Sequence, residues 1–275
     1  MASLLDLIEN RSAMKESWDK FITRAKELAA RESDTAELLT FYSKLLDAQK
    51  QVYEYLTRKK GLHLSGMLAR DLSAVRTIMP SLLEVVRASG PAALAAEAER
   101  LLQASEDEIS EMLTEYWIAP TDVRFFAKAF LQPYACRLVE IGAKPSDRNL
   151  GTGENRCPFC AGKPQVAVLK THDPDSDVGS RHLLCSTCLT VWPFRRVLCA
   201  NCGEESPAKL GYFHTDEYDH ARAEFCDSCK HYIKSIDLMK LGLALPLVDE
   251  VAAAPLDVWA HERGYIKIEL NLVGL

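Results

Sequence analysis

The segment CPFCAGKPQVAVLKTHDPDSDVGSRHLLCSTC, residues 157–188, decides the fold of the C-terminal half of this chain. It begins and ends with a Cys-x-x-Cys pair, and residues 161–184 separate the two pairs. A second unit follows, in which CANC at 199–202 and CDSC at 226–229 are separated by residues 203–225. Eight of the nine cysteines therefore lie in four regularly spaced pairs. The repeated spacing predicts metal ligands, because unrelated core thiols would have no reason to recur in this way.

Four thiolates hold zinc or iron in a tetrahedron with metal–sulfur distances of about 2.3 Å. Each Cys-x-x-Cys turn supplies two of the four, so the chain is predicted to hold two metal ions. Serial pairing is favoured because its connections are short, and the alternative is a cross-brace in which the first and third pairs share a metal. The predicted ligands are Cys157, Cys160, Cys185 and Cys188 at one site and Cys199, Cys202, Cys226 and Cys229 at the other.

The four-cysteine ligand sets predict the type of site, but they suit more than one metal. A closed site of four thiolates has no open position for a substrate, so it is a poor hydrolytic centre. Zinc and iron both suit four sulfur ligands in a tetrahedron. Two glycines near the pairs, Gly162 and Gly203, are expected to supply positive φ in the turns that follow the second ligand.

The composition is that of an ordinary soluble globular protein, with 48% hydrophobic and 26% charged residues. No apolar run approaches the ~20 residues that span a bilayer, and the start MASLLDLIENRSAMKESW lacks the basic region of a signal peptide. We therefore expect a cytoplasmic protein without membrane insertion, whose thiols stay reduced. The net charge of −6 argues against a nucleic-acid-binding protein, which would usually be basic.

Residues 1–150 are predicted to form a domain of five to seven helices packed as an irregular bundle. An apolar stripe runs through residues 34–58, where Asp34 and Glu37 resemble a capping box. A further helix at 121–140 is expected to kink or break at Pro133. The segment 142–156, rich in Gly, Pro, Ser and Asn, is the predicted linker.

Residues 151–275 are predicted to form a second domain, a tandem rubredoxin-like or zinc-ribbon module with two Cys₄ metal sites and a C-terminal helix. Short strands are expected at 165–169, 181–184, 189–198 and 209–214. The helix is expected at 247–263. The predicted fold class is therefore α+β, with the helical bundle first and the metal-binding module after it.

Other candidate sites carry less weight. The acidic run from His172 to Asp177 alternates like a calcium loop but lacks the required Gly and Glu, so a solvated hairpin loop is predicted. Cys136 is expected to be a buried, inert thiol. His182, His214, His220 and His231 lie among the cysteine pairs. They are expected to be spectators, because eight cysteines already fill two sites.

The aromatic and basic run at 192–196 is predicted to be a hydrophobic strand that connects the two metal sites, because acidic residues nearby weaken a nucleic-acid interpretation. The chain has no Ser-His-Asp order, phosphate loop or dinucleotide fingerprint, so no enzyme is predicted.

The order CPFC, CSTC, TVWPFRRVLCANC and AEFCDSCKHYIKSID, together with the helical stretch FFAKAFLQPYA, resembles the FdhE family of formate dehydrogenase accessory proteins. The resemblance covers most of the chain, and its specific part is the C-terminal half. It implies a non-catalytic maturation factor that acts in the cytoplasm on the catalytic subunit of formate dehydrogenase. It also implies rubredoxin-type iron on the same eight cysteines.

Three other functions compete with the accessory role. A rubredoxin-like electron carrier would act during maturation of a metalloenzyme and requires iron. Sulfur transfer through a persulfide requires a free thiolate, and two full sites would leave only Cys136. A nucleic-acid-binding zinc ribbon is disfavoured by the charge. The sequence leaves the formation of a homodimer open.

Overall fold

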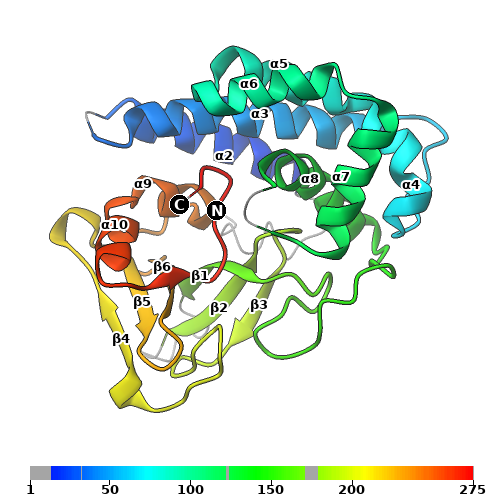
Figure 1. Cartoon of the computed structure of the whole chain (residues 1–275). Helices are drawn as coiled ribbons and strands as arrows, with labels where there is room; N and C mark the ends of the chain where they lie inside the picture. The colour runs from blue at the N-terminus through cyan, green and yellow to red at the C-terminus, as the bar shows by residue number, and fades with distance from the viewer. Residues whose placement is uncertain (1–13, 32, 122–123, 171–178, 275) are drawn as a thin grey trace.

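The computed structural model of the chain describes residues 14–31, 33–121, 124–170 and 179–274. Helices form one layer and a β-sheet lies below them, with two short C-terminal helices at the side (Figure 1). Helices come first in the chain, and the sheet that follows carries two groups of four cysteines. The predicted α+β fold class is confirmed.

The helical layer contains seven α-helices before residue 142 in the described ranges, which is the upper end of the predicted number. They are α2 (Met14–Ala29), α3 (Ala36–Arg58), α4 (Leu68–Val75), α5 (Met79–Ser89), α6 (Ala92–Leu102), α7 (Glu106–Ile118) and α8 (Phe125–Ile141).

The longest of these helices, α3, buries the apolar stripe that the sequence predicted. The expected capping box at its start is wrong, because the helix begins at Ala36 after Thr35 and no side chain caps it. A side-chain cap is found instead at α7. There Ser105 Oγ accepts a hydrogen bond of 3.1 Å from the backbone N–H of Glu108, as Ser commonly does at a helix N-terminus.

Helix α8 is buried along most of its length and continues through Pro133, so the helix does not break there, and the kink, the other expectation, stays a prediction. Proline has no N–H to donate to the carbonyl four residues earlier, which belongs to Ala129. The side chain of Gln49 on α3 donates to that carbonyl instead, with an Nε2–O distance of 2.8 Å. The carbonyl that the proline would leave unpaired therefore has a partner inside the core.

Six of the seven strands in the described part of the sheet form two copies of one three-stranded unit. The units are β1 (Pro164–Lys170), β2 (Ser180–Cys185) and β3 (Val191–Phe194), and then β4 (Leu210–Phe213), β5 (Ala221–Cys226) and β6 (His231–Asp237). The strand order is β3-β2-β1-β6-β5-β4, so each unit runs from its third strand to its first in the same direction across the sheet. Neighbours within a unit are antiparallel, and the units join where β1 pairs in parallel with β6.

The expected strands at 165–169, 181–184 and 209–214 correspond to β1, β2 and β4. The strand expected at 189–198 is shorter, because β3 ends at Phe194. The sequence does not predict β5 and β6. Arg222 and Glu224 interrupt the apolar pattern of β5, and Lys234, which is fully buried, interrupts that of β6.

The single helix expected at 247–263 is in fact two helices, α9 (Pro246–Ala252) and α10 (Pro255–Glu262). Pro255 lacks the N–H that a continuous helix would need, and it stands at the first position of the second helix. Helix α9 packs against α2, β1 and β6, and Arg24 on α2 pairs with Asp249 on α9 at 2.5 Å. Strand β7 (Ile266–Lys267) then pairs with the start of β6.

One continuous cluster of buried apolar side chains includes residues of the helical layer, both sheet units and α9. The metal-binding half is thus packed onto the helices through a shared core. The division into domains 1–150 and 151–275 stays a prediction.

Candidate metal centres

The eight predicted ligands come together in two groups, and each group contains the cysteines of one sheet unit. The thiols of Cys157, Cys160, Cys185 and Cys188 form the first group, and those of Cys199, Cys202, Cys226 and Cys229 form the second. Within each group the sulfur atoms lie within 4.8 Å of one another. The grouping is serial and not cross-braced. We call the two groups the first and second Cys₄ sites.

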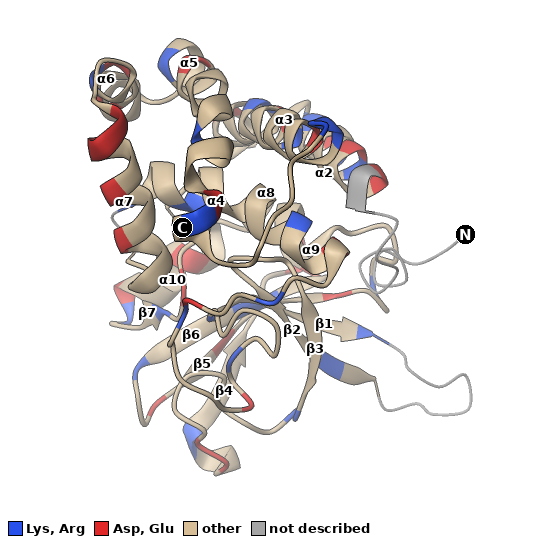
Figure 2. Ribbon diagram, turned by 90° about the vertical axis from the view of Figure 1, so that its right-hand side faces the viewer, with Lys and Arg blue, Asp and Glu red and all other residues tan. Residues whose placement is uncertain are grey.

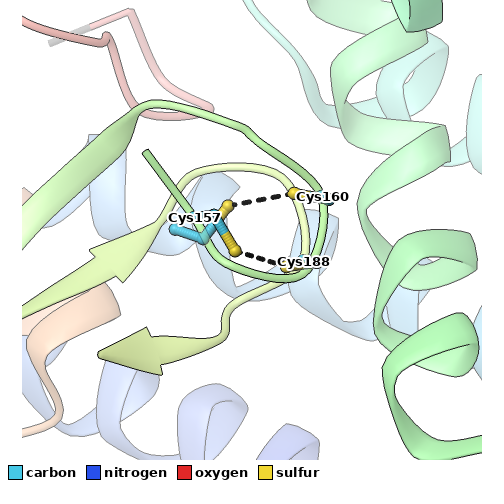
Figure 3. A group of neighbouring side chains, drawn as sticks. Cys157, Cys160 and Cys188 are labelled. Atoms are coloured by element: carbon cyan, nitrogen blue, oxygen red, sulfur yellow. Dashed lines mark hydrogen bonds between the residues drawn. The ribbon is translucent and has the colours of Figure 1, made fainter. Parts of the chain in front are cut away.

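The sulfur–sulfur distances match those of a tetrahedral site. At the first site, Cys157 and Cys188 are 3.6 Å apart and Cys160 and Cys185 are 3.4 Å apart. Figure 3 shows the side chains of Cys157, Cys160 and Cys188 turned toward one another between two loops. A tetrahedron with metal–sulfur distances of about 2.3 Å has edges of about 3.8 Å. At the second site, the sulfur atoms of Cys199 and Cys229 are 3.7 Å apart and those of Cys202 and Cys226 are 3.8 Å apart.

The second cysteine of every pair is followed by a residue with positive φ. The four residues are Ala161, Leu189, Gly203 and Lys230, with φ between 56 and 76°. In three of the turns, the N–H of that residue donates to the carbonyl of the first cysteine, at 2.9 to 3.1 Å. The same turn is therefore made four times, and three of the four positions tolerate a side chain despite the strain.

Gly162 plays a different role from the one expected. Positive φ falls on Ala161 instead. A Cβ at Gly162 would lie 2.9 Å from Thr187 Oγ1 and 3.0 Å from Cys185 Sγ. Glycine is needed at this position because the first turn packs closely against the second. The prediction for Gly203 is confirmed, since its φ is 76°.

Backbone N–H groups point at the sulfur atoms, as a thiolate ligand requires. The N–H of Thr187 lies 3.3 Å from Cys185 Sγ, and that of Asn201 lies 3.4 Å from Cys199 Sγ. These donors sit in the x-x positions of the pairs. Hydrogen bonds to the charged form of a group favour that form, so the turns stabilise negative charge on these sulfurs.

The two sites differ in burial. All four cysteines of the first site are buried, whereas Cys202 of the second is exposed and Cys229 is half-buried. Burial raises the pKa of the Cys199 thiol to about 12. Burial also acts to raise the pKa of Cys229, but hydrogen bonds from Asn201 and from the backbone of His231 outweigh it and lower the pKa to about 7. The hydrogen bonds from this turn thus favour the thiolate form of Cys229.

The first site rests against helix α8. Gln132 Nε2 donates to the carbonyl of Ser186, inside the second Cys-x-x-Cys turn, at 2.9 Å. Cys136 is fully buried, as predicted, and its thiol lies 3.7 Å from the carbonyl of Cys188. Burial raises the pKa of Cys136 well above its ordinary value, which keeps this thiol protonated.

No histidine belongs to either group within the described residues. His231 Nδ1 lies 2.7 Å from the carbonyl of Cys229, and His220 lies 3.4 Å from Asp249. The acidic run at 172–177 lies outside the described residues, so the loop predicted there is not tested. Trp192 and Phe194 are buried in β3. This strand pairs with β2 at the edge of the first unit and does not bridge the two units, so the predicted connecting role is wrong.

None of the helices in the described part of the chain is long and apolar enough to cross a bilayer.

The comparisons with known proteins agree on one family. Residues 156–196 match the central domain of FdhE, and residues 197–273 match its C-terminal domain. An FdhE homologue from Aquifex aeolicus is 35% identical over 70% of this chain and 68% of its own length. FdhE of Escherichia coli O1:K1 is 26% identical over 94% of this chain and 88% of its own length.

The fold of the chain also matches a solved structure of an FdhE protein. The crystal structure of FdhE from Pseudomonas aeruginosa superposes with a TM-score of 0.69, at 22% identity, over 94% of this chain and 96% of that one. The match therefore extends over the helical layer as well as the two Cys₄ sites. From these matches, the chain belongs to the FdhE family of formate dehydrogenase accessory proteins.

Proposed function

We propose that this protein is a maturation factor that binds the catalytic subunit of formate dehydrogenase in the cytoplasm and is needed for the assembly or activity of that enzyme. The observation that carries the proposal is the family membership, since both characteristic domains match over residues 156–273. The two Cys₄ sites, which offer no position for a substrate, support a binding role and not a catalytic one.

We further propose that the eight cysteines bind two metal ions, either iron or zinc. The sulfur–sulfur distances of 3.4 to 3.8 Å and the N–H groups directed at sulfur support this assignment. Bound metal would pin the loops at one end of each sheet unit, and bound iron would add one-electron chemistry. In such modules, the free energy of metal binding contributes directly to the free energy of folding.

The chain's own residues would transmit metal binding to the helical layer. Gln132 on α8 holds the carbonyl of Ser186, and Gln49 on α3 donates to Gln132 Oε1 at 3.1 Å. A first site without metal would release the turn that accepts this hydrogen bond. We therefore expect the client-binding form of the protein to require both sites to be filled.

A second function, a rubredoxin-like electron carrier, is favoured by one observation. Cys202 is exposed, so a bound iron ion at the second site would lie close to the surface, where a partner could exchange an electron with it. This alternative requires iron and a reversible potential. Protein that contains only zinc when isolated from its host would exclude it.

The first experiment is an anaerobic affinity purification from the native host grown on formate, followed by mass spectrometry. Enrichment of the formate dehydrogenase catalytic subunit supports the proposal, provided that replacing Cys199 and Cys202 by Ser removes it. The matched control is Cys136→Ser, because Cys136 belongs to neither site, and this variant should retain the client. If intact, metal-filled protein brings down no catalytic subunit, the maturation role is wrong.

A further inference from the structure

A cavity of about 870 Å³ lies between the segment after α8 and the first sheet unit. Its walls come from residues 144–145 and 148–154, from the first Cys-x-x-Cys turn at 156–161, and from residues 179–182 and 192–196. We call it the linker cavity. Its volume lies within the range of sites for small organic ligands, ~300–1,000 Å³.

The lining of the linker cavity is strongly basic. It contains six cations and one carboxylate, namely Lys144, Arg148, Arg156, Arg181, Arg195, Arg196 and Glu154. The formal charge is therefore +5 (six minus one) in a chain whose net charge is −6. The neighbouring strands add no negative charge, since β1 and β2 each carry one Lys or Arg residue and no acidic one, and β3 carries no charged residue (Figure 2).

Two of the six cations are neutralised by the protein itself. Arg181 pairs with Glu224 at 2.8 Å, and Arg195 pairs with Glu154 and Glu205. The remaining four have no carboxylate within 4.0 Å among the residues that the structure describes. They are Lys144, Arg148, Arg156 and Arg196.

Arg148 shows most clearly that an acceptor is missing. Its guanidinium carbon lies 4.4 Å from the centre of the Trp117 ring. All three guanidinium nitrogens are buried, and no atom in the described part of the chain accepts a hydrogen bond from them. A buried cation without acceptors has lost its hydration and gained only the aromatic face in return. An anion in the adjacent cavity would supply the missing negative charge.

We propose that the linker cavity binds an organic phosphate of nucleotide size. Guanidinium groups recognise phosphate through paired N–H donors, and three of the four cations without a carboxylate are arginines. Apolar residues of the wall, including Pro158, Phe159 and Pro193, offer a surface to the organic part of the ligand. The walls converge from three chain segments around one volume, which favours a compact ligand over an extended acidic peptide. The proposal does not depend on the action of the protein on formate dehydrogenase.

The test is isothermal titration calorimetry of the full chain with ADP, GDP and pyrophosphate, each added alone, at near-physiological salt. Metal content is measured before and after, because pyrophosphate also binds metals. We expect one ligand per chain, with binding weakened about tenfold by Arg156→Gln and by Arg196→Gln. Equal affinity for pyrophosphate and the nucleotides would place recognition in the phosphates alone, and tighter nucleotide binding would show that the organic part contributes.

The matched control is Arg58→Gln, because Arg58 is exposed at the end of α3 and does not line the cavity. Lys144→Gln, at an exposed wall position, keeps the test valid if an arginine variant fails to fold, and it should also weaken binding. The proposal is overturned if none of the three probes binds at millimolar concentration, or if Arg58→Gln weakens binding as much as the cavity variants do. Tighter binding of a polyglutamate peptide, which the nucleotides cannot displace, would overturn it as well.

Discussion

Gln132 on helix α8 donates a hydrogen bond of 2.9 Å to the carbonyl of Ser186, which lies between two predicted metal ligands. Both residues are buried, so neither group can turn to water if the other is lost. Gln49 completes the chain, because its Nε2 donates both to Gln132 and to the carbonyl that Pro133 leaves without an N–H partner. This pair of glutamines thus supplies hydrogen-bond donors to a carbonyl of helix α8 and to a carbonyl in the Cys-x-x-Cys turn. It joins the helical layer to the first Cys₄ site.

Replacing Gln132 should therefore destabilise the protein more than its small contact area suggests. In Gln132→Ala, the carbonyl of Ser186 stays buried without a donor, and we expect a loss of about 1–3 kcal/mol in the free energy of unfolding. Urea unfolding of the metal-loaded protein measures it. Gln51→Ala, at an exposed position on α3, is the control and should change the free energy by less than about 0.5 kcal/mol. Equal effects of the two substitutions would show that the Gln132 bridge contributes nothing.

The different burial of the two Cys₄ sites predicts two rates of metal release. A chelator can approach the second site, where Cys202 is exposed, but must wait for local opening at the first site, where all four cysteines are buried. We expect zinc-loaded protein to release one metal ion quickly and the other slowly when a coloured chelator is added in excess. Absorbance against time measures both phases.

Variants assign the two phases. Cys202→Ser should remove the fast phase and keep the slow one, and Cys136→Ser, which changes no predicted ligand, should keep both. A single phase that accounts for two metal ions would contradict the prediction. Loss of the fast phase in Cys185→Ser, with the slow one kept, would show that the order of release is reversed.

The Cys₄ sites could be predicted from the sequence because the information is local. A Cys-x-x-Cys turn fixes two ligands by itself, and the length of residues 161–184 and 203–225 fits a hairpin that returns to the same place. The joining of the two sheet units has no such local signal. Parallel pairing of β1 with β6 brings Val166 beside Lys234, and no local pattern encodes a contact between segments so far apart.

The other omissions also come from long-range contacts. Lys234 is an unusual strand residue on its own, but in the fold it pairs with Glu250 at 3.2 Å and with Asp257, which makes its burial tolerable. The basic linker cavity has the same origin. Lys144 and Arg196 lie more than fifty residues apart in the sequence, and only the packing of the linker against the first unit brings such charges together.

Gly162 gives a prediction specific to the first site. In Gly162→Ala, the new methyl group would meet Thr187 Oγ1 at 2.9 Å and Cys185 Sγ at 3.0 Å, distances that require the two turns to move apart. We expect the purified variant to hold about one metal ion per chain where the wild-type chain holds two, measured by inductively coupled plasma mass spectrometry. Gly242→Ala is the control, since its added methyl group would meet nothing closer than 3.7 Å. Full metal content in Gly162→Ala would show that the turns can separate at no cost to the site.

The ion pair between Arg24 and Asp249 predicts how stability depends on pH. Burial acts to raise the pKa of Asp249, but hydrogen bonds from His220 and Arg24 outweigh it, so the pKa lies below its ordinary value. A carboxyl group with a lowered pKa in the folded state stabilises the protein above its unfolded pKa of about 4, and this contribution is lost as pH falls further.

Since acid also protonates thiolate ligands, the informative quantity is the difference in the free energy of unfolding between wild type and Asp249→Asn. Each protein is unfolded with urea from pH 7 down to the acid limit of folding. We expect wild type to be the more stable at neutral pH and the difference to shrink below about pH 4. A difference that stays constant across this range would mean that the charge of Asp249 does not stabilise the junction of α2 and α9.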